Sequence, residues 1–160
     1  MAAHPRPISH ISIGVRNYAV SKAFYAAVLE PLGLLLVYDS ETTSLSPATS
    51  SSPPSSKRRT LGFGPDADHE MVNIFEVGEH AAAPGPGCHV AFNAPTRAAV
   101  REFYEQAIRL GGTGDGEPAL RRYYEPRYYA TFVIDPDGWR LEAVCKADTE
   151  AEGLTPTIQA

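Results

Sequence analysis

Three side chains of the kind that bind metal ions lie on predicted strands that are far apart in the sequence. Glu142 sits in the middle of the run Trp139–Cys145, and the alternation of side chains places it on the face opposite the core residues of that strand. His10 and His89 each open an alternating strand, and both imidazoles point away from the core. A polar group on such a face can be solvated, form an ion pair or bind a metal. Alternation alone leaves all three readings open.

The chain contains an internal duplication. A strand histidine, an aromatic pair in a helix and a glycine that ends the helix recur at one constant separation. The matched residues are His10 with His89, Phe24-Tyr25 with Phe103-Tyr104, and Gly33 with Gly112. One match of this kind could arise by chance, but all of them together indicate two copies of one supersecondary unit.

Each copy begins with a strand and one helix. The first helix is predicted over Tyr18–Glu30 with Asn17 as N-cap, and the second over Arg97–Leu110 with Thr96 as N-cap. The apolar stripe of the first helix is predicted to hold Val20, Ala23, Phe24, Ala27 and Val28. Three strand-like runs follow each helix, so that each unit is βαβββ. The predicted strands are Ser9–Val15, Leu34–Ser40, Thr60–Gly64, Glu70–Val77, Cys88–Ala94, Gly116–Leu120, Tyr128–Asp135 and Trp139–Cys145.

Length and composition fit one globular domain, because 160 residues with 43% hydrophobic content can bury a sizeable core. We interpret residues 1–160 as a single domain, with a first module at 8–77, a second module at 87–145 and a polar tail at 146–160. A Ser-, Thr- and Pro-rich stretch at 42–56 is predicted to be a surface insertion, either a solvated loop or a lid.

Charge and hydropathy argue against several classes of partner. A formal net charge of −5 disfavours binding to nucleic acid or anionic membranes, and the basic run Lys57-Arg58-Arg59 is too short to change that. No apolar run approaches the ~20 residues of a membrane span, and no signal peptide is recognisable, so we expect a cytoplasmic protein. Cys88 and Cys145 are expected to be free thiols.

These features together resemble the vicinal oxygen chelate superfamily, which includes glyoxalase I, fosfomycin- and bleomycin-resistance proteins and extradiol dioxygenases. The resemblance rests on the two βαβββ units, His10 with Phe24-Tyr25, and the runs Gly87–Phe92 and Tyr128–Gly138, the latter ending in Asp-Pro-Asp-Gly. It covers Ile8 to Val144. It implies an α+β fold in which two βαβββ modules form a curved mixed sheet around a central cavity, with the helices outside.

The resemblance also implies a metal site. The family carries ligands on the first and last strands of each module, which gives His10, His89 and Glu142 here, with Glu142 also as the catalytic carboxylate. Two imidazoles and one carboxylate suit a divalent ion such as Fe(II), Mn(II), Zn(II) or Ni(II).

The family's fourth ligand position lies on the last strand of the first module. If Val72 and Ile74 pack against the helices, then Asn73, Phe75 and Val77 face the cavity, and Glu76 needs a one-residue bulge to reach it. We therefore favour a three-ligand site and keep Glu76 as a fourth ligand only in the bulged case.

A run rich in arginine and tyrosine precedes the last two strands. Guanidinium groups bind carboxylates and phosphates, and tyrosines offer a flat apolar face with one polar tip, although a cross-strand aromatic ladder explains the same composition. Only one of the adjacent Tyr128 and Tyr129 can face the cavity. The candidate substrate-binding residues are Phe75, Asn93, Arg121, Tyr124 and Tyr128.

The resemblance implies a metal-dependent enzyme that acts on a small oxygenated substrate. Lyase or isomerase chemistry is favoured over extradiol-type oxygenation. The alternative is a metal-free protein of the bleomycin-resistance type, which sequesters a small molecule. Members of this superfamily commonly form dimers, so a homodimer is expected.

Overall fold

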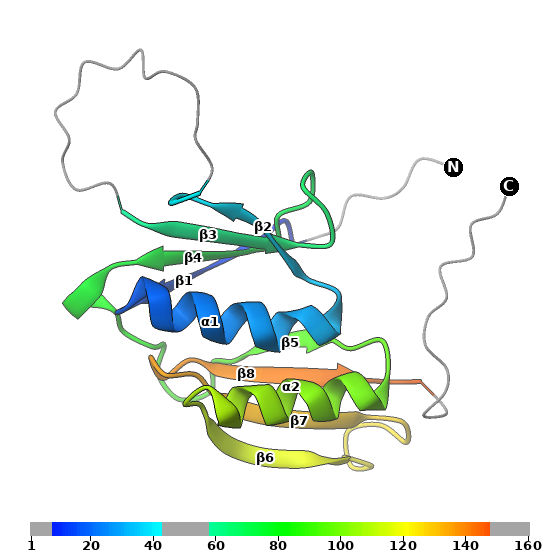
Figure 1. Ribbon diagram of the computed structural model, residues 1–160. Helices are drawn as coiled ribbons and strands as arrows, with labels where there is room; N and C mark the ends of the chain where they lie inside the picture. Colours follow the sequence, from blue (N-terminus) through cyan, green and yellow to red (C-terminus); the bar gives the residue numbers. More distant parts are fainter. Residues whose placement is uncertain (1–7, 43–57, 148–160) are drawn as a thin grey trace, which may run out of the picture.

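The computed structural model describes residues 8–42 and 58–147 and consists of two βαβββ units in series. The predicted fold class is confirmed (Figure 1). Residues 43–57 and 148–160, which hold the predicted insertion and most of the polar tail, lie outside the described part of the chain. The first unit contains β1 (Ile11–Val15), α1 (Tyr18–Leu29), β2 (Leu35–Asp39), β3 (Thr60–Gly64) and β4 (Val72–Glu76). The second contains β5 (Val90–Asn93), α2 (Arg97–Arg109), β6 (Thr113–Leu120), β7 (Tyr129–Ile134) and β8 (Arg140–Cys145).

The strands form two separate mixed sheets of four, in the orders β1-β4-β3-β2 and β5-β8-β7-β6. In each sheet the first and last strands of the unit are parallel neighbours, and the other pairs are antiparallel. The registers of the two parallel pairs are equivalent, because Ser12 lies opposite Asn73 in one and Ala91 lies opposite Glu142 in the other. Figure 1 shows both helices on the same side of the strands. The other faces of the two sheets, which we call the open faces, point away from the helices.

Side-chain caps start both helices at the predicted residues. Asn17 accepts a hydrogen bond from Val20 N, and Thr96 accepts one from Ala99 N, each at 3.0 Å. The predicted stripe of α1 is partly wrong, because Val20 is 45% exposed while Tyr25 is fully buried. The buried face of α1 is rotated toward Tyr25, because the Tyr25 hydroxyl donates a hydrogen bond to Asp135 of the second unit.

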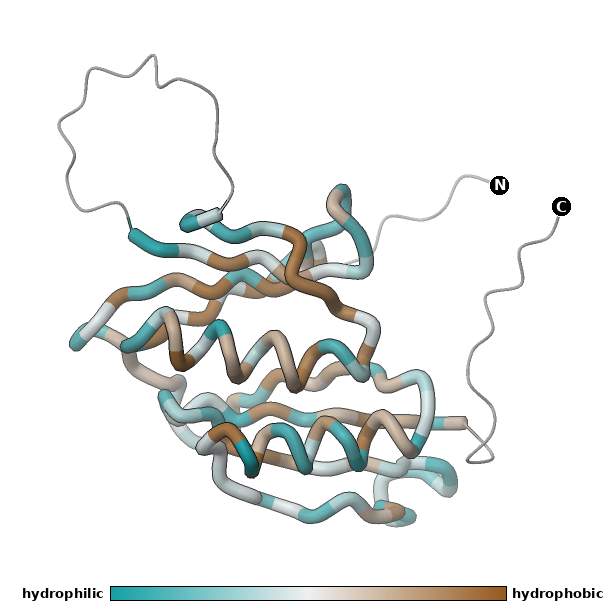
Figure 2. Tube along the Cα trace, viewed as in Figure 1, coloured by the Kyte–Doolittle hydropathy of each residue, from teal (hydrophilic) through white to brown (hydrophobic). Residues whose placement is uncertain are grey.

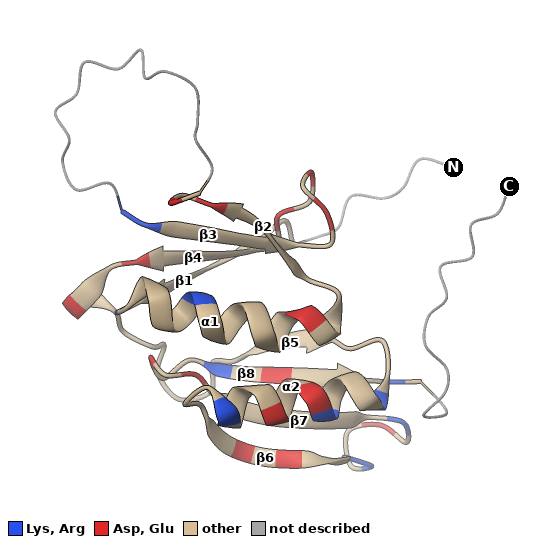
Figure 3. Cartoon of the chain, viewed as in Figure 1, with Lys and Arg blue, Asp and Glu red and all other residues tan. Residues whose placement is uncertain are grey.

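The core lies between the helices and the strands. Phe24, Phe63, Phe103 and Leu141 are completely buried, and α1 packs against α2. Figure 2 shows hydrophobic residues concentrated along the central strands and on alternating turns of the helices. Figure 3 shows acidic and basic residues interspersed over both units. Within the described ranges, no helix is long and apolar enough to cross a membrane.

The turn between β7 and β8, Asp135 to Gly138, connects the second unit to the first. Tyr25 on α1 donates a hydrogen bond from its hydroxyl to Asp135 Oδ2 at 2.6 Å, and Asp135 Oδ1 accepts from the backbone N–H groups of Asp137 and Trp139. The carboxylate of Asp137 accepts from Arg16 N at 3.0 Å. Burial raises the pKa of Asp135, although these donors oppose the shift.

Asp39, at the end of β2, ties that edge strand to α1. Its carboxylate is 4% exposed and accepts hydrogen bonds from the Tyr18 hydroxyl and from Lys22 Nζ, the latter at 2.6 Å. Burial by itself would raise the pKa of Asp39, but the hydrogen bonds from Lys22 and Tyr18 outweigh it and lower the pKa to about 2.

Replacing Tyr25 with Phe removes the hydroxyl donor of a buried carboxylate. We expect Tyr25→Phe to lower the free energy of unfolding by about 1–3 kcal/mol, measured by urea denaturation. Tyr104→Phe is the matched control, because Tyr104 is the duplicate of Tyr25 and has no carboxylate partner in the described part of the chain. Equal losses in the two variants would contradict a special role for the Tyr25–Asp135 bond.

Asp39 should make stability depend on pH in the acid range. Because its pKa is lower in the folded chain than in the unfolded chain, its stabilisation is complete above about pH 4 and is lost as the pH falls toward about 2. The difference in unfolding free energy between the wild type and Asp39→Asn should shrink by roughly 2 kcal/mol over this window. Urea denaturation of both proteins between about pH 4 and pH 2 measures this difference. A difference that stays constant over this range would rule out a lowered pKa of Asp39 in the folded chain.

Candidate functional site

Glu142 lies on the open face of the second sheet. Its neighbours along β8, Leu141 and Ala143, are completely buried in the core, so alternation turns Glu142 to the other side. The carboxylate is nevertheless nearly inaccessible, with its side chain 3% exposed. A buried carboxylate is costly unless it is hydrogen-bonded or paired, so its partners define the site.

His89 is the first partner. It immediately precedes β5, and the parallel pairing of β5 with β8 brings its Nε2 to 3.0 Å from Glu142 Oε2. The imidazole is about one third exposed, with a side-chain accessibility of 35%, so one side of the pair faces outward. The structure thus brings together two of the three predicted ligands.

Tyr128 is the second partner, and its hydroxyl donates a hydrogen bond to Glu142 Oε1 at 2.6 Å. Burial first, and then this hydrogen bond and the negative charge of Glu142, raise the pKa of Tyr128 above its ordinary value. Tyr128 is therefore a protonated donor at neutral pH. Its neighbour Tyr129 lies beneath the Arg97 guanidinium, 5.3 Å from the ring centroid, and so takes the other side of the strand.

Aromatic rings and guanidinium groups surround the pair. Phe132 lies opposite Glu142 in the strand register, and its ring centroid is 6.0 Å from that of His89. Arg140 and Arg121 lie over the same ring at 4.6 and 5.9 Å. Arg140 is paired with Asp115, and the buried Arg121 Nε has no hydrogen-bond partner.

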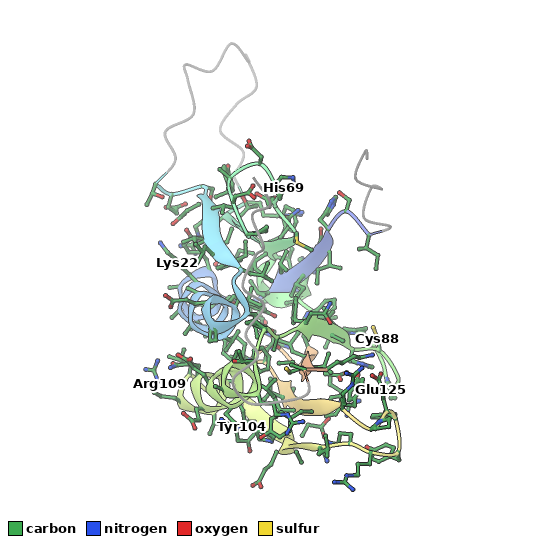
Figure 4. The ribbon with its side chains drawn as sticks, turned by 90° about the vertical axis from the view of Figure 1, so that its right-hand side faces the viewer. Lys22, His69, Cys88, Tyr104, Arg109 and Glu125 are labelled. Atoms are coloured by element: carbon green, nitrogen blue, oxygen red, sulfur yellow. The ribbon has the colours of Figure 1, made fainter. Side chains whose placement is uncertain are left out.

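Tyrosines extend the aromatic surface. The ring centroids of Tyr124 and Tyr128 are 5.2 Å apart, and those of Tyr123 and Tyr124 are 4.3 Å apart. Figure 4 labels Cys88 and Glu125, near neighbours of His89 and Tyr128 in the chain, on the side away from Lys22 and Arg109 of the helices. The cluster therefore belongs to the open face.

His10 is not part of this cluster. It precedes β1 in the other sheet, is exposed, and contacts Ser9 Oγ through Nδ1 at 3.3 Å. Among residues 8–42 and 58–147, no three His, Cys, Asp or Glu side chains are arranged to hold a metal ion. Within one chain, β1 and β5 belong to two separate sheets that are not paired with each other, so a site shared by His10 and His89 stays a prediction.

Glu76 has a structural role. Arg59 donates to both of its carboxylate oxygens, at 2.6 and 2.7 Å, and Tyr18 N donates to Oε1 at the start of α1. The hydrogen bonds from Arg59 and Tyr18 lower the pKa of Glu76. Both oxygens are thus engaged on the core side, which argues against Glu76 as a fourth ligand.

Asn73 is the residue that sequence reasoning undervalued. It lies opposite Ser12 as Glu142 lies opposite Ala91, so it is the counterpart of Glu142 in the first sheet. Its Oδ1 is buried and has no hydrogen-bond partner. In each parallel pair, this residue lies two positions beyond the one that would stand opposite the strand histidine. That count would have identified Asn73 from the sequence.

Phe75 lies on the same open face as Asn73 and is half-buried, while Asn93 is exposed at the end of β5.

Comparison with known proteins gives a consistent result. The family described as Glyoxalase/Bleomycin resistance protein/Dioxygenase superfamily matches residues 7–143. A glyoxalase/bleomycin resistance protein from Albidiferax ferrireducens is 25% identical with a TM-score of 0.62, covering 86% of this chain and 98% of that one. No curated protein matches the chain.

Two further solved structures share the fold. The fosfomycin resistance protein FosX from Mesorhizobium loti is 20% identical with a TM-score of 0.57, covering 88% of this chain and 92% of that one. A glyoxalase I mutant from Zea mays is 19% identical with a TM-score of 0.62, covering 89% of this chain and 47% of that one.

The phenol of Tyr128 should titrate at higher pH than free tyrosine. We expect Glu142→Gln to lower the pKa of Tyr128 only part of the way, because the negative charge is lost while burial remains. Carbon-13 NMR of labelled tyrosine rings across the alkaline range measures this, with Glu102→Gln on α2 as the control. An unchanged Tyr128 titration in Glu142→Gln would contradict the described contact.

Proposed function

The chain belongs to the Glyoxalase/Bleomycin resistance protein/Dioxygenase superfamily, and we propose that it is a divalent-metal-dependent enzyme acting on a small oxygenated substrate by lyase or isomerase chemistry. The observation that carries the proposal is the pair of His89 and Glu142, whose ligand-type atoms face each other at 3.0 Å on the open face of the second sheet. Fe(II), Mn(II), Zn(II) and Ni(II) all accept imidazole and carboxylate ligands.

The geometry of the pair fits a shared ion. Two ligand atoms that lie about 2.1 Å from one ion and at right angles to each other are about 3.0 Å apart. The contact between His89 Nε2 and Glu142 Oε2 has this length. Tyr128, bound to the other carboxylate oxygen at 2.6 Å, would act as the outer partner that orients the ligand.

A second copy of the chain would supply the third ligand. His10 is exposed at the start of the edge strand β1, and β5 is the matching edge of the other sheet. In such a homodimer, the open face of the first sheet of one copy would meet the open face of the second sheet of the other copy. His10 of one chain would then lie near His89 and Glu142 of the other. Asn73, with its unpaired Oδ1, would enter the same site.

A bound divalent ion would supply Lewis-acid polarisation of substrate oxygens. The chain's own residues hold and orient the reactants. Glu142 is the central catalytic carboxylate, fixed by Tyr128 and His89. Tyr124 is exposed and offers aromatic surface for the substrate, and the positive charge of Arg121 favours a negatively charged group.

A metal-free binding function is the second candidate. It is favoured by the fact that Tyr128 and His89 already satisfy both oxygens of Glu142. The adjoining rings of Tyr123, Tyr124 and Tyr128 would then stack on a sequestered aromatic molecule. Metal content decides between the two candidates.

Protein purified without chelator should contain one divalent ion per chain by elemental analysis. We expect His10→Ala, His89→Ala and Glu142→Ala each to abolish stoichiometric metal, because each removes one of three ligands. His80→Ala, an exposed histidine outside the strands, is the control and should retain the ion. A wild type without metal would favour the sequestering protein instead.

Mixed dimers test the arrangement across two chains within the same measurement. A dimer of one His10→Ala chain and one Glu142→Ala chain keeps one complete site if ligands come from both copies, and none if they come from one. Co-refolded mixtures should therefore regain metal that neither variant binds alone. Failure to regain it would refute the dimeric site.

A further inference from the structure

Each unit has an outer strand with one backbone edge that pairs with no other strand. Within residues 8–42 and 58–147, β2 pairs only with β3 and β6 pairs only with β7, and the two strands lie at opposite ends of the molecule (Figure 1). Such an edge can add a strand from another chain unless charged residues or proline protect it. Because the units are duplicates, the two edges can be compared position by position.

The strand pairing aligns the two outer strands. Leu36 lies opposite Phe63 and Gly114 lies opposite Val133, and both outer strands are irregular directly after this pair. Positions 63 and 133 are equivalent in the duplicated sheets. Leu36 therefore corresponds to Gly114, and the run 35–38 of β2 corresponds to the run 113–116 of β6.

The two edges differ in their protection against pairing. At the aligned positions β6 has Thr-Gly-Asp-Gly, and it continues with Glu117 and Pro118, which discourage edge pairing. The aligned residues of β2 are Leu-Leu-Val-Tyr, and Leu35 and Leu36 are 51% and 37% exposed. The single charged residue of β2, Asp39, is buried and bound to α1. The edge of β2 is thus apolar and unprotected, as expected for a strand that pairs with another chain.

Charges on α1 favour a second copy of the same strand as the partner. Lys22 lies at the end of β2, because its Nζ is 2.6 Å from Asp39 Oδ2. Glu30 is exposed and lies just before the turn that leads into the start of β2. Antiparallel pairing brings the start of one strand against the end of the other, so Glu30 of each copy approaches Lys22 of the other copy.

The second unit shows the opposite arrangement of charge. The helix positions equivalent to Lys22 and Glu30 are Arg101 and Arg109, so the same pairing of two β6 strands would bring like charges together. Charge complementarity and apolar exposure therefore select the same edge, that of β2.

We propose that β2 is an interface between two copies of this chain, in which two β2 strands pair antiparallel and join the first sheets into one. Leu36 becomes covered there on the helix side of the sheet, the side to which its buried neighbour Phe63 points. This contact does not involve the open faces. Together with the open-face dimer of the proposed function it gives a tetramer.

Leu36→Lys tests the interface through the molar mass of the oligomer. The substitution places a charge on the pairing strand, so we expect it to halve the molar mass measured by light scattering at micromolar protein concentration. Ile108→Lys is the matched control, because Ile108 is an apolar residue of α2 with a similar exposure of 42%, and it should keep the wild-type mass.

Glu30→Lys is an independent variant at an exposed position, so it decides the question even if Leu36→Lys fails to fold. It sets two lysines against each other at each end of the paired strands. We expect it to weaken the β2 contact about tenfold at low salt and by less at high salt, measured by sedimentation velocity over a dilution series. Arg109→Glu, the charge reversal at the equivalent position of α2, should leave association unchanged.

The outcomes separate this interface from the open-face dimer. A tetramer that becomes a dimer in Leu36→Lys supports both contacts, and a dimer that becomes a monomer supports the β2 contact alone. An oligomer whose mass and dissociation are unchanged in Leu36→Lys and Glu30→Lys overturns a second copy as the occupant of the edge, whether solvent or another partner covers it. A monomeric wild type overturns both contacts.

Discussion

The hydrogen bond between Tyr25 and Asp135 joins the two halves of the chain at a buried point. Asp135 is 4% exposed, and its carboxylate oxygens accept hydrogen bonds from the Tyr25 hydroxyl and from two backbone N–H groups of its own turn. The same turn receives Arg16 N through Asp137 and places Trp139 against Gly14 of β1. Because β8 begins at this turn, the contact with the first unit holds the start of the strand that carries Glu142. The register of β8 with β5 and β7 then places Glu142 in its sheet.

The two units have the same order of strands and helix, but they carry different polar side chains on their open faces. The second sheet carries a histidine, a buried carboxylate and a tyrosine in mutual contact. The first sheet carries the equivalent histidine, but an amide at position 73 and a glycine at position 62 replace the carboxylate and the phenylalanine ring. The duplicated scaffold thus presents different side chains on its two open faces.

Much of the fold was predictable because its signals are local. Alternation identified the open face of each strand, and capping residues identified both helix starts. The neighbouring positions of His89 and Glu142 followed from the resemblance, which makes the first and last strands of a unit adjacent. The buried face of α1 was misjudged, because Tyr25 looks like a surface residue until its distant partner Asp135 is known. Glu76 was left open because strand alternation does not show that Arg59, 17 residues earlier, donates to its carboxylate.

The separation of His10 from the cluster could not be read from the sequence, because the placement of one unit against the other depends on packing between α1 and α2. Asn73 was visible as an open-face residue, but its equivalence to Glu142 required the register of two parallel pairs.

The parallel pairing of β5 with β8 has a consequence for biosynthesis. The strand that follows His89 leaves the ribosome long before the strand that carries Glu142, and the helix and two other strands of the unit are made between them. Until β8 emerges, β5 has no partner in its sheet and its backbone edge is open to unwanted pairing with other chains. Contacts between residues so distant in sequence form slowly, so the sheet of the second unit can be completed only at the end of that unit's synthesis.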